Sequence, residues 1–394
     1  MTRAIIAAAC CAAMLFLLSC VSPASVRESG PVRIGLYADL SSTGAREGND
    51  ALKGAQLRIN EANAAGGIGG RQVQLISLDM KQSPTEAVKA FTKLAQEDGV
   101  CAVIGSAVFN AGLAVSPVAD LAKVPLVSLS IDDRVTNPEM KADVPDTPGP
   151  VRQYAFLIQP SASQIAGFVA AYALEHFLLN RYATLYDPAS AVSVLQARTF
   201  ESVIRKGGKV ISASVELPEG DYSGPLSKIR RVGADAIFVC CSVDKNVAVA
   251  QQAMAMAYQP VFLGNQAWYA PLLDQAGAAS NSAWFGMGVA PDDPGLAEIG
   301  PKFQAQFGEN PGLAVVPGWD AAGLIIAAVR KAGSSNPQKV RTALEQTLGF
   351  KCLTAQIDMG KKTHKPLMLP IAIMRIISGA YLTAEPRYIP KPAR

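Results

Sequence analysis

The fold is decided by residues 32–67, which read VRIGLYADLSSTGAREGNDALKGAQLRINEANAAGG. The run at 32–40 is apolar enough for a buried strand, and the Ser-Ser-Thr-Gly sequence at 41–44 supplies a turn. Apolar residues then recur at helical spacing until paired glycines end the helix. These apolar residues are Leu52, Ala55, Ile59 and Ala62. The stretch therefore predicts one βα unit.

The same alternation continues in two series, which a proline-rich loop at 137–152 separates. The further strands expected in the first series lie at 73–78, 101–105 and 125–130. The strands expected in the second lie at 155–158, 182–186, 210–215, 236–241, 261–264 and 284–289. After them we expect helices that pack back on the first series, one at 324–329, and short antiparallel strands at 370–377 and 380–382. Alternating strands and helices imply an α/β fold with parallel sheets covered on both faces.

Length and charge narrow the class of protein. The chain has 394 residues, more than one ordinary core holds, so we expect two cores. The formal net charge is +4, and no run of lysines and arginines combines with aromatic residues. The sequence therefore predicts no nucleic-acid partner.

The N-terminus predicts export. An apolar run at 4–18 follows Arg3, which fits a secretory signal and is too short to span a bilayer. The run ends in Leu17-Leu18-Ser19-Cys20, which resembles a bacterial lipobox; the alternative is an ordinary signal peptide with an incidental cysteine. We expect a lipoprotein signal peptide at 1–19, lipidation at Cys20 and a tether at 20–30. The mature chain is then extracytoplasmic, in the periplasm or at the cell surface, and only its lipid touches the membrane.

Motifs for catalysis and cofactors are missing from the sequence. It contains neither a G-x-x-x-x-G-K-[ST] phosphate loop nor a G-x-S-x-G nucleophile motif, and the glycines at 66–70 follow a helix instead of preceding one. Only two histidines, His176 and His364, are present, so a histidine-based metal or acid–base site is not expected. We expect no enzyme activity, no cofactor and no metal. The sequence leaves open a disulfide among Cys101, Cys240, Cys241 and Cys352.

Polar residues follow the carboxyl ends of the predicted strands, where open α/β sheets bind ligands. Hydroxyl groups and helix N-terminal amides suit an anion such as a carboxylate, and Asp132 suits a cation. The alternative for each residue is that it caps the next helix. The candidate ligand-binding residues are Ser42, Thr43, Ser106, Ala107, Val108, Phe109, Ser130, Ile131, Asp132, Ser190, Ser242, Gln266 and Trp268.

A set of short motifs, in order along the chain, is specific as a set although each is weak alone. The motifs are LSSTG at 40–44, INEAN at 59–63, GGIGGR at 66–71, VIGS at 103–106, VPLVS at 124–128, DYS at 221–223 and WDAA at 319–322. With them the chain resembles the type I periplasmic binding proteins of the branched-chain amino acid group. The resemblance covers nearly the whole mature chain.

The resemblance implies two Rossmann-like, doubly wound lobes joined by three crossovers. Lobe 1 would comprise 31–156 and 288–350, and lobe 2 would comprise 157–287 and 351–394. In such proteins a ligand carboxylate meets the loops that correspond to 106–109 and 130–132, and an acidic residue of the second lobe usually holds an ammonium group. Gln266 aligns with that acidic residue here. Either Asp132 replaces it, or the ligand is an amide, an aromatic acid or another small polar molecule.

The function expected is that of an extracytoplasmic solute-binding lipoprotein that captures a small polar ligand, such as an amino acid or a related amide or acid, and delivers it to the permease of an ABC importer. Closure of the lobes would signal that the site is occupied. The alternative is an extracytoplasmic sensor of the same fold. A two-domain α/β enzyme is disfavoured because no nucleophile and base pair is found.

Overall fold

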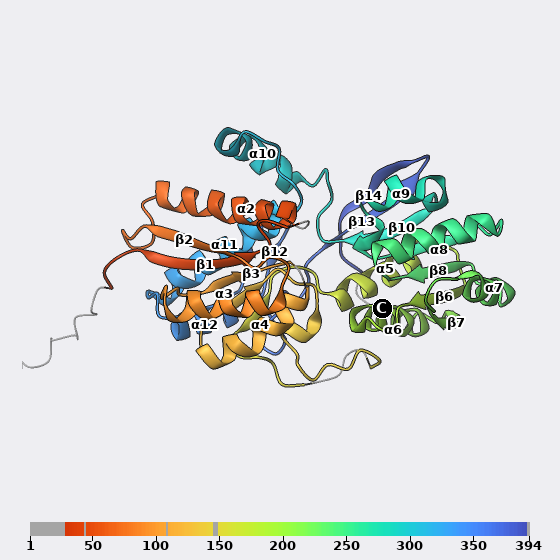
Figure 1. Cartoon of the computed structure of the whole chain (residues 1–394), viewed down its shortest axis with the longest axis horizontal. Helices are drawn as coiled ribbons and strands as arrows, with labels where there is room; N and C mark the ends of the chain where they lie inside the picture. The colour runs from red at the N-terminus through yellow and green to blue at the C-terminus, as the bar shows by residue number, and fades with distance from the viewer. Residues whose placement is uncertain (1–27, 43–44, 108, 145–148, 392–394) are drawn as a thin grey trace, which may run out of the picture. The chain divides into compact units, whose positions relative to one another are not determined.

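The structure is a computed structural model that describes residues 28–42, 45–107, 109–144 and 149–391 (Figure 1). The predicted signal peptide and Cys20 lie outside the described residues. The helices and strands belong to one compact unit, Pro31–Arg394. None of the helices in the described ranges is long and apolar enough to cross a membrane.

The first sheet is parallel throughout, with the order β2-β1-β3-β4-β5. Its strands are β1 (Val32–Ala38), β2 (Val73–Asp79), β3 (Val103–Gly105), β4 (Leu126–Ser128) and β5 (Ala155–Leu157). The helices around it are α2 (Ala45–Ala64), α3 (Pro84–Gln96), α4 (Phe109–Ala122), α11 (Val315–Ala332) and α12 (Pro337–Glu345). In β1 only Arg33 is exposed, as the apolar run predicts for a strand covered on both faces.

Helices α2 and α11 pack closely because each has a glycine against the backbone of the other helix. A Cβ atom on Gly54 would lie 2.1 Å from the carbonyl oxygen of Val315, and one on Gly318 would lie 2.1 Å from that of Ala51. No larger residue fits at either position without a shift of backbone. Helix α11 thereby completes the first core from a distant part of the chain.

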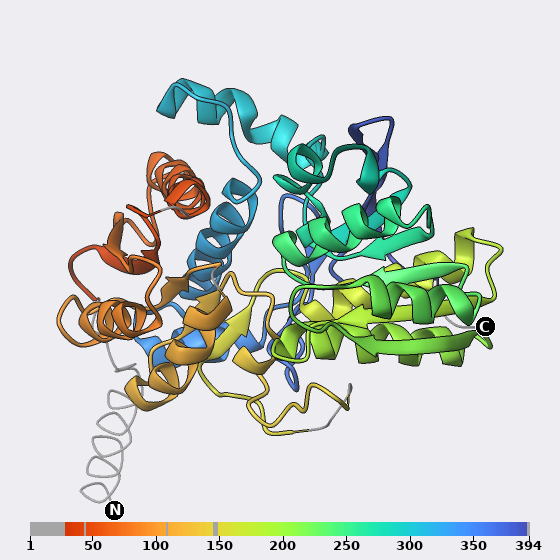
Figure 2. The ribbon, with the colours of Figure 1, turned by 45° about the vertical axis from the view of Figure 1, so that its right-hand side comes forward.

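The second sheet has the order β14-β13-β10-β9-β8-β6-β7. Its strands are β6 (Arg181–Tyr186), β7 (Val210–Glu216), β8 (Ala236–Val239), β9 (Val261–Gly264), β10 (Ala283–Met287), β13 (Ile371–Ile377) and β14 (Ala380–Tyr388). Strands β6 to β10 pair in parallel, whereas β13 and β14 form the antiparallel C-terminal hairpin, dark blue in Figure 2. The associated helices are α5 (Ala162–His176), α6 (Ala191–Lys206), α7 (Ser223–Arg231), α8 (Val243–Ala255) and α9 (Leu272–Ala276).

The chain passes between the two sheets three times, after β5, after β10 and before β13. Helix α10 (Pro294–Phe307) follows the second passage, and the short strands β11 (Phe350–Lys351) and β12 (Gln356–Ile357) precede the third. The expected α/β class, with two doubly wound lobes and three crossovers, is confirmed. Part of the segment 351–369, which the sequence analysis assigned to lobe 2, packs in the first core. The residues concerned are Cys352, Ile357, Met359 and Leu369.

Candidate functional site

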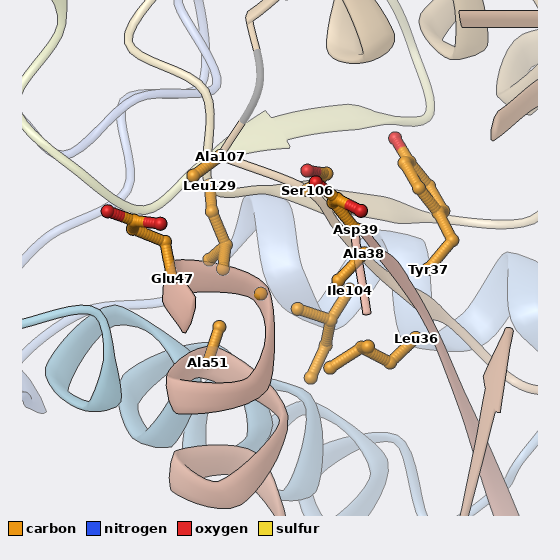
Figure 3. Close-up of a pocket in the computed structure, with 12 residues that line it drawn as sticks. Leu36, Tyr37, Ala38, Asp39, Glu47, Ala51, Ile104, Ser106, Ala107 and Leu129 are labelled. Carbon is orange, nitrogen blue, oxygen red and sulfur yellow. The ribbon is translucent and has the colours of Figure 1, made fainter. Parts of the chain in front are cut away.

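The order of the first sheet creates a crevice between β1 and β3. The chain leaves β1 for β2 on one side and reaches β3 on the other, and ligands bind at such switch points, beyond the carboxyl ends of the strands. A small cavity of about 30 Å³ lies at this point, lined by Asp39 after β1, by Ser106 and Ala107 after β3, and by Glu47 from the first turn of α2 (Figure 3). The strand order thus brings the carboxylates of Asp39 and Glu47 and the hydroxyl of Ser106 to the wall of one cavity.

A larger cavity of about 270 Å³ shares Glu47, Ala107 and Leu129 with the small one. Its other lining residues come from the chain crossings and from elements of both sheets. They are Ile131, Gln159, Pro160, Ile165, Gln266, Tyr269, Met287, Gly288, Val289, Leu313, Ala314 and Pro317. Most of this wall is apolar, so the cavity suits a ligand with an apolar body.

Several predicted site residues line these cavities. Ser106 lines the small cavity, Ala107 lines both, and Ile131 and Gln266 line the larger one. Thr43, Val108 and the side chain of Phe109 lie outside the described part of the chain.

The other predicted serines act mainly on the backbone or on neighbouring side chains. The Ser42 hydroxyl donates to the Asp39 carboxylate, Ser130 Oγ accepts the amide of Asp132 at 3.1 Å, and Ser190 caps α6 by accepting the amide of Ser193 at 3.3 Å. Ser190 is therefore a helix-capping residue, which is the alternative given for each candidate in the sequence analysis. Ser242 occupies the N-cap position of α8 and is exposed, with no side-chain capping bond.

Asp132 is fully buried and engaged within the protein. The Arg134 guanidinium donates from Nε to Oδ1 at 3.0 Å and from Nη2 to Oδ2 at 2.7 Å. Oδ1 also accepts the backbone amide of Arg134 at 2.9 Å, which caps the 3₁₀ turn Asp133–Val135. A carboxylate held by a bidentate arginine is already neutralised, so Asp132 is not expected to bind the ammonium group of a ligand.

Trp268 and Gln266 have different places although both belong to one short 3₁₀ helix. Trp268 is fully buried, packs on Phe262 and donates its indole N–H to the Val239 carbonyl at 2.9 Å. It is a core residue. Gln266 lines the larger cavity, and its buried Oε1 has no hydrogen-bond donor among the described residues.

Glu47 was missed by the sequence analysis, which considered only residues directly after strands. It lines the small cavity, the larger cavity and a third one of about 470 Å³ beside them. It is the one charged residue among those that line the larger cavity. An acidic residue in the first turn of the helix after β1 was the available signal.

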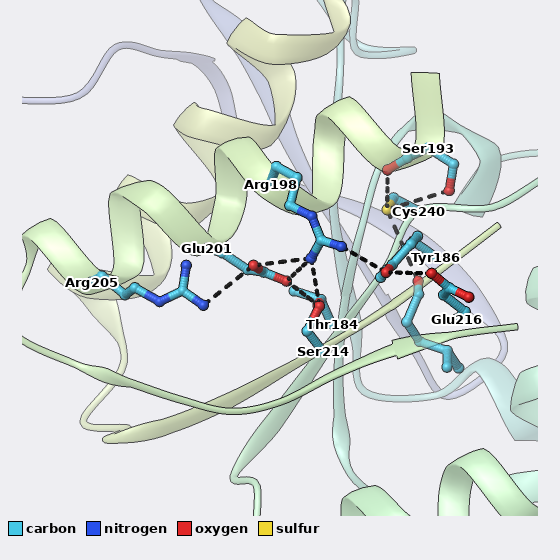
Figure 4. Close-up of polar contacts among 10 residues, drawn as sticks. Thr184, Tyr186, Ser193, Arg198, Glu201, Arg205, Ser214, Glu216 and Cys240 are labelled. Atoms are coloured by element: carbon cyan, nitrogen blue, oxygen red, sulfur yellow. Dashed lines mark hydrogen bonds and ion pairs between the residues drawn. The ribbon is translucent and has the colours of Figure 1, made fainter. Parts of the chain in front are cut away.

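A second polar cluster, in the second lobe, serves the fold (Figure 4). The Glu201 carboxylate on α6 is buried and accepts the hydroxyls of Thr184 and Ser214, each at 2.6 Å, and pairs with Arg198 at 3.1 Å. These partners lie on β6, β7 and α6. Because a buried carboxylate needs such partners, the cluster fixes α6 on the sheet and leaves that group no free acceptor role toward a ligand.

The four described cysteines, Cys101, Cys240, Cys241 and Cys352, are free and buried. Burial raises the pKa of the Cys241 thiol to about 12, so this group stays protonated. Within the described ranges no group of three or more histidine, cysteine, aspartate or glutamate side chains is placed to hold a metal ion.

Two doubly wound lobes with a cavity at the switch point define the type I periplasmic binding protein fold. The chain belongs to the periplasmic binding protein family, whose model matches residues 31–380. The resemblance seen in the sequence is thereby confirmed. Members of this family are substrate-binding proteins, and the family implies an extracytoplasmic location.

Proteins similar to this chain include some that are named for branched-chain amino acids. The Leu/Ile/Val-binding protein homolog 1 of Brucella suis is 24% identical over 334 residues, which cover 84% of this chain and 86% of the relative. The structure of a branched-chain amino acid transporter substrate-binding protein from Streptococcus pneumoniae, in complex with isoleucine, has a TM-score of 0.71 and 24% identity, covering 90% of this chain and 100% of that one. A solute-binding protein of R. palustris in complex with benzoate has a TM-score of 0.69 and 18% identity, covering 93% and 98%.

Proposed function

We propose that the protein is an extracytoplasmic solute-binding lipoprotein that encloses a small ligand between two lobes and delivers it to an ABC importer. The observation that carries this proposal is the larger cavity, because its wall combines residues of both lobes with residues of the chain crossings. Ligand contacts made by both lobes at once provide a reason for the lobes to close.

The composition of the cavity supports a small ligand with an apolar body and a polar head. Apolar side chains such as Ile131, Ile165 and Leu313 form much of the wall, and Gln159, Gln266 and Glu47 are its polar members besides the Tyr269 hydroxyl. An amino acid or a related amide or acid fits this description. The bound molecules of the two similar structures, isoleucine and benzoate, each join a carboxylate to an apolar body.

Binding without turnover is also part of the proposal. Among the described residues that line the larger cavity there is no serine, cysteine, histidine or lysine. Such a wall offers neither the nucleophile and base pair of acyl transfer nor a histidine acid.

The proposed organisation of the chain follows the sequence analysis, with one adjustment. We propose a signal peptide at 1–19, a lipid on Cys20, a tether at 20–30, lobe 1 at 31–156 and 288–350, and lobe 2 at 157–287 and 351–394. Packing of Ile357 and Leu369 in the first core supports moving 351–369 to lobe 1.

A thermal-shift screen of the purified protein tests the proposed function. The panel contains amino acids, their amides, short aliphatic acids and aromatic acids. A ligand at 100 times its dissociation constant adds about 2.7 kcal/mol to the free energy of unfolding, which moves the melting temperature by several degrees. A panel without any stabilising compound would count against this ligand class.

A further inference from the structure

We infer that Glu47 makes the site selective for ligands that carry a cationic ammonium group on a small apolar body. This inference rests on the proposed function, because it names the charge of the ligand that the same cavity holds. It replaces the role that the sequence analysis gave to Asp132.

The position of Glu47 is the first observation. The residue lies in the first turn of α2, beside the carboxyl end of β1 (Figure 3). The three cavities of about 30, 270 and 470 Å³ each include it in their walls. The charge of this carboxylate therefore acts on any ligand that occupies the larger cavity.

The Glu47 carboxylate is not paired with another group in the described part of the protein. Neither a hydrogen bond nor an ion pair joins its carboxylate to another described residue. The nearby acids differ: Asp39 accepts both the hydroxyl and the amide of Ser42, and Asp132 is held by Arg134. Glu47 is thus the one acid in the described wall of the larger cavity, and its carboxylate stays available to a ligand.

The surrounding charges do not cancel that of Glu47. All other residues that line the larger cavity are uncharged. The third cavity adds Arg46 and Asp50, whose formal charges offset each other, so its wall remains negative through Glu47. Lys53, further along α2, is already paired with Glu309. An ammonium group is therefore favoured over a second carboxylate in this part of the site.

The other polar members of the wall suit the same head group. The Gln266 Oε1 is an acceptor that lacks a donor among the described residues and belongs to an element of the second lobe. Tyr269 lines both the larger and the third cavity and presents an aromatic ring together with Glu47. A carboxylate, an amide oxygen and an aromatic ring are the groups that bind an ammonium, which has three hydrogen atoms to donate.

Paired ligands that differ only in the ammonium group test the inference directly. Isothermal titration calorimetry compares leucine with 4-methylpentanoic acid, and phenylalanine with 3-phenylpropanoic acid, on the wild-type protein, on Glu47→Gln and on Glu219→Gln. Glu219 lies exposed in the loop after β7 and is the matched control for loss of one carboxylate.

In wild type, the amino compound of at least one pair is expected to bind about 10-fold or more tightly than its deaminated partner, as for loss of one charged hydrogen bond. Glu47→Gln is expected to weaken the amino compound by about 10- to 100-fold and to change the deaminated acid by less than about threefold. Glu219→Gln is expected to bind like wild type. Glu47 is exposed and lies in the first turn of α2, so the variant should melt within a few degrees of wild type, since only the interaction of one charge with the helix N-terminus is lost.

The outcomes separate the inference from the proposed function. If the deaminated acids bind as tightly as the amino compounds, or if Glu47→Gln leaves the affinity for the amino compound unchanged, the inference is wrong while small-ligand binding stands. If neither pair binds to wild type, the inference is wrong, while the amides and the other acids of the thermal-shift panel still test the proposed function.

Discussion

The imidazole of His364 stacks on the ring of Phe156, with the ring centroids 4.2 Å apart and an angle of 10° between the planes. The Nδ1–H of His364 donates to the Ala155 carbonyl at 3.1 Å, and the amide of Leu157 donates back to the His364 carbonyl at 2.9 Å. These contacts attach the segment before β13 to β5, the last strand of the first sheet. His364 is therefore a structural residue at a chain crossing.

The lowered pKa of His364 predicts that the protein loses stability in mild acid. Burial is the main cause that lowers the pKa of His364. The unfolded chain then takes up a proton at a higher pH than the folded protein, so stability falls as the pH drops below about 6.5. Urea unfolding at pH 8 and pH 5 should show a larger loss for wild type than for His364→Gln. His176→Gln, at a side chain that is 41% exposed, is the control and should behave like wild type.

Asp132 is expected to affect stability and not ligand binding. Asp132→Ala leaves Arg134 without its partner and removes the cap of a 3₁₀ turn, which should cost about 2 to 3 kcal/mol of the free energy of unfolding. Urea unfolding measures this loss, with Asp143→Ala in the exposed part of the same loop region as control. Affinity for any compound that stabilises wild type should stay within about twofold. Weaker binding with unchanged stability would indicate that Asp132 binds the ligand.

Cys20→Ala is expected to release the protein from membranes, because the lipid on Cys20 is the proposed anchor. Cell fractionation followed by immunoblotting measures the share of protein in the membrane fraction, and Cys10→Ala within the signal is the matched control. A Cys20→Ala protein that stays with the membranes after loss of its signal would contradict the lipobox interpretation.

Closure of the lobes is expected when a ligand binds. A ligand can shift this equilibrium only through contacts that it makes better in the closed form, and the larger cavity offers contacts from both lobes. Small-angle scattering should show a smaller radius of gyration when a compound from the thermal screen is present at saturation. An unchanged profile would indicate a rigid pocket.

The sequence predicted the βα units of the first lobe well, since their strands are buried apolar runs. It placed only 324–329 in a helix where α11 begins at Val315, because Pro317 and Gly318 resemble helix breakers. Proline is tolerated in the first turn of a helix, and Gly318 serves the contact with α2. Strand β14 likewise continues past Pro386, which an edge strand tolerates.

The candidate site was predicted where it depends on strand ends. Ser106, Ala107, Ile131 and Gln266 were found in this way and line the cavities. Glu47 was missed because a residue in a first helical turn reaches a cavity only through tertiary packing. Trp268 was selected for its place after β9, but a short 3₁₀ helix turns its ring into the core.

The glycine contacts between α2 and α11 have a consequence for recognition. Because the helices approach so closely at Gly54 and Gly318, sliding one along the other would press the Cβ atom of a neighbouring residue against the opposing backbone, so we expect the two helices to move together. Glu47 at the start of α2 and Pro317 in the first turn of α11 both belong to this pair of helices. This half of the binding wall is therefore preorganised: the entropy of ordering it is lost during folding, and a ligand has to order only the opposite half.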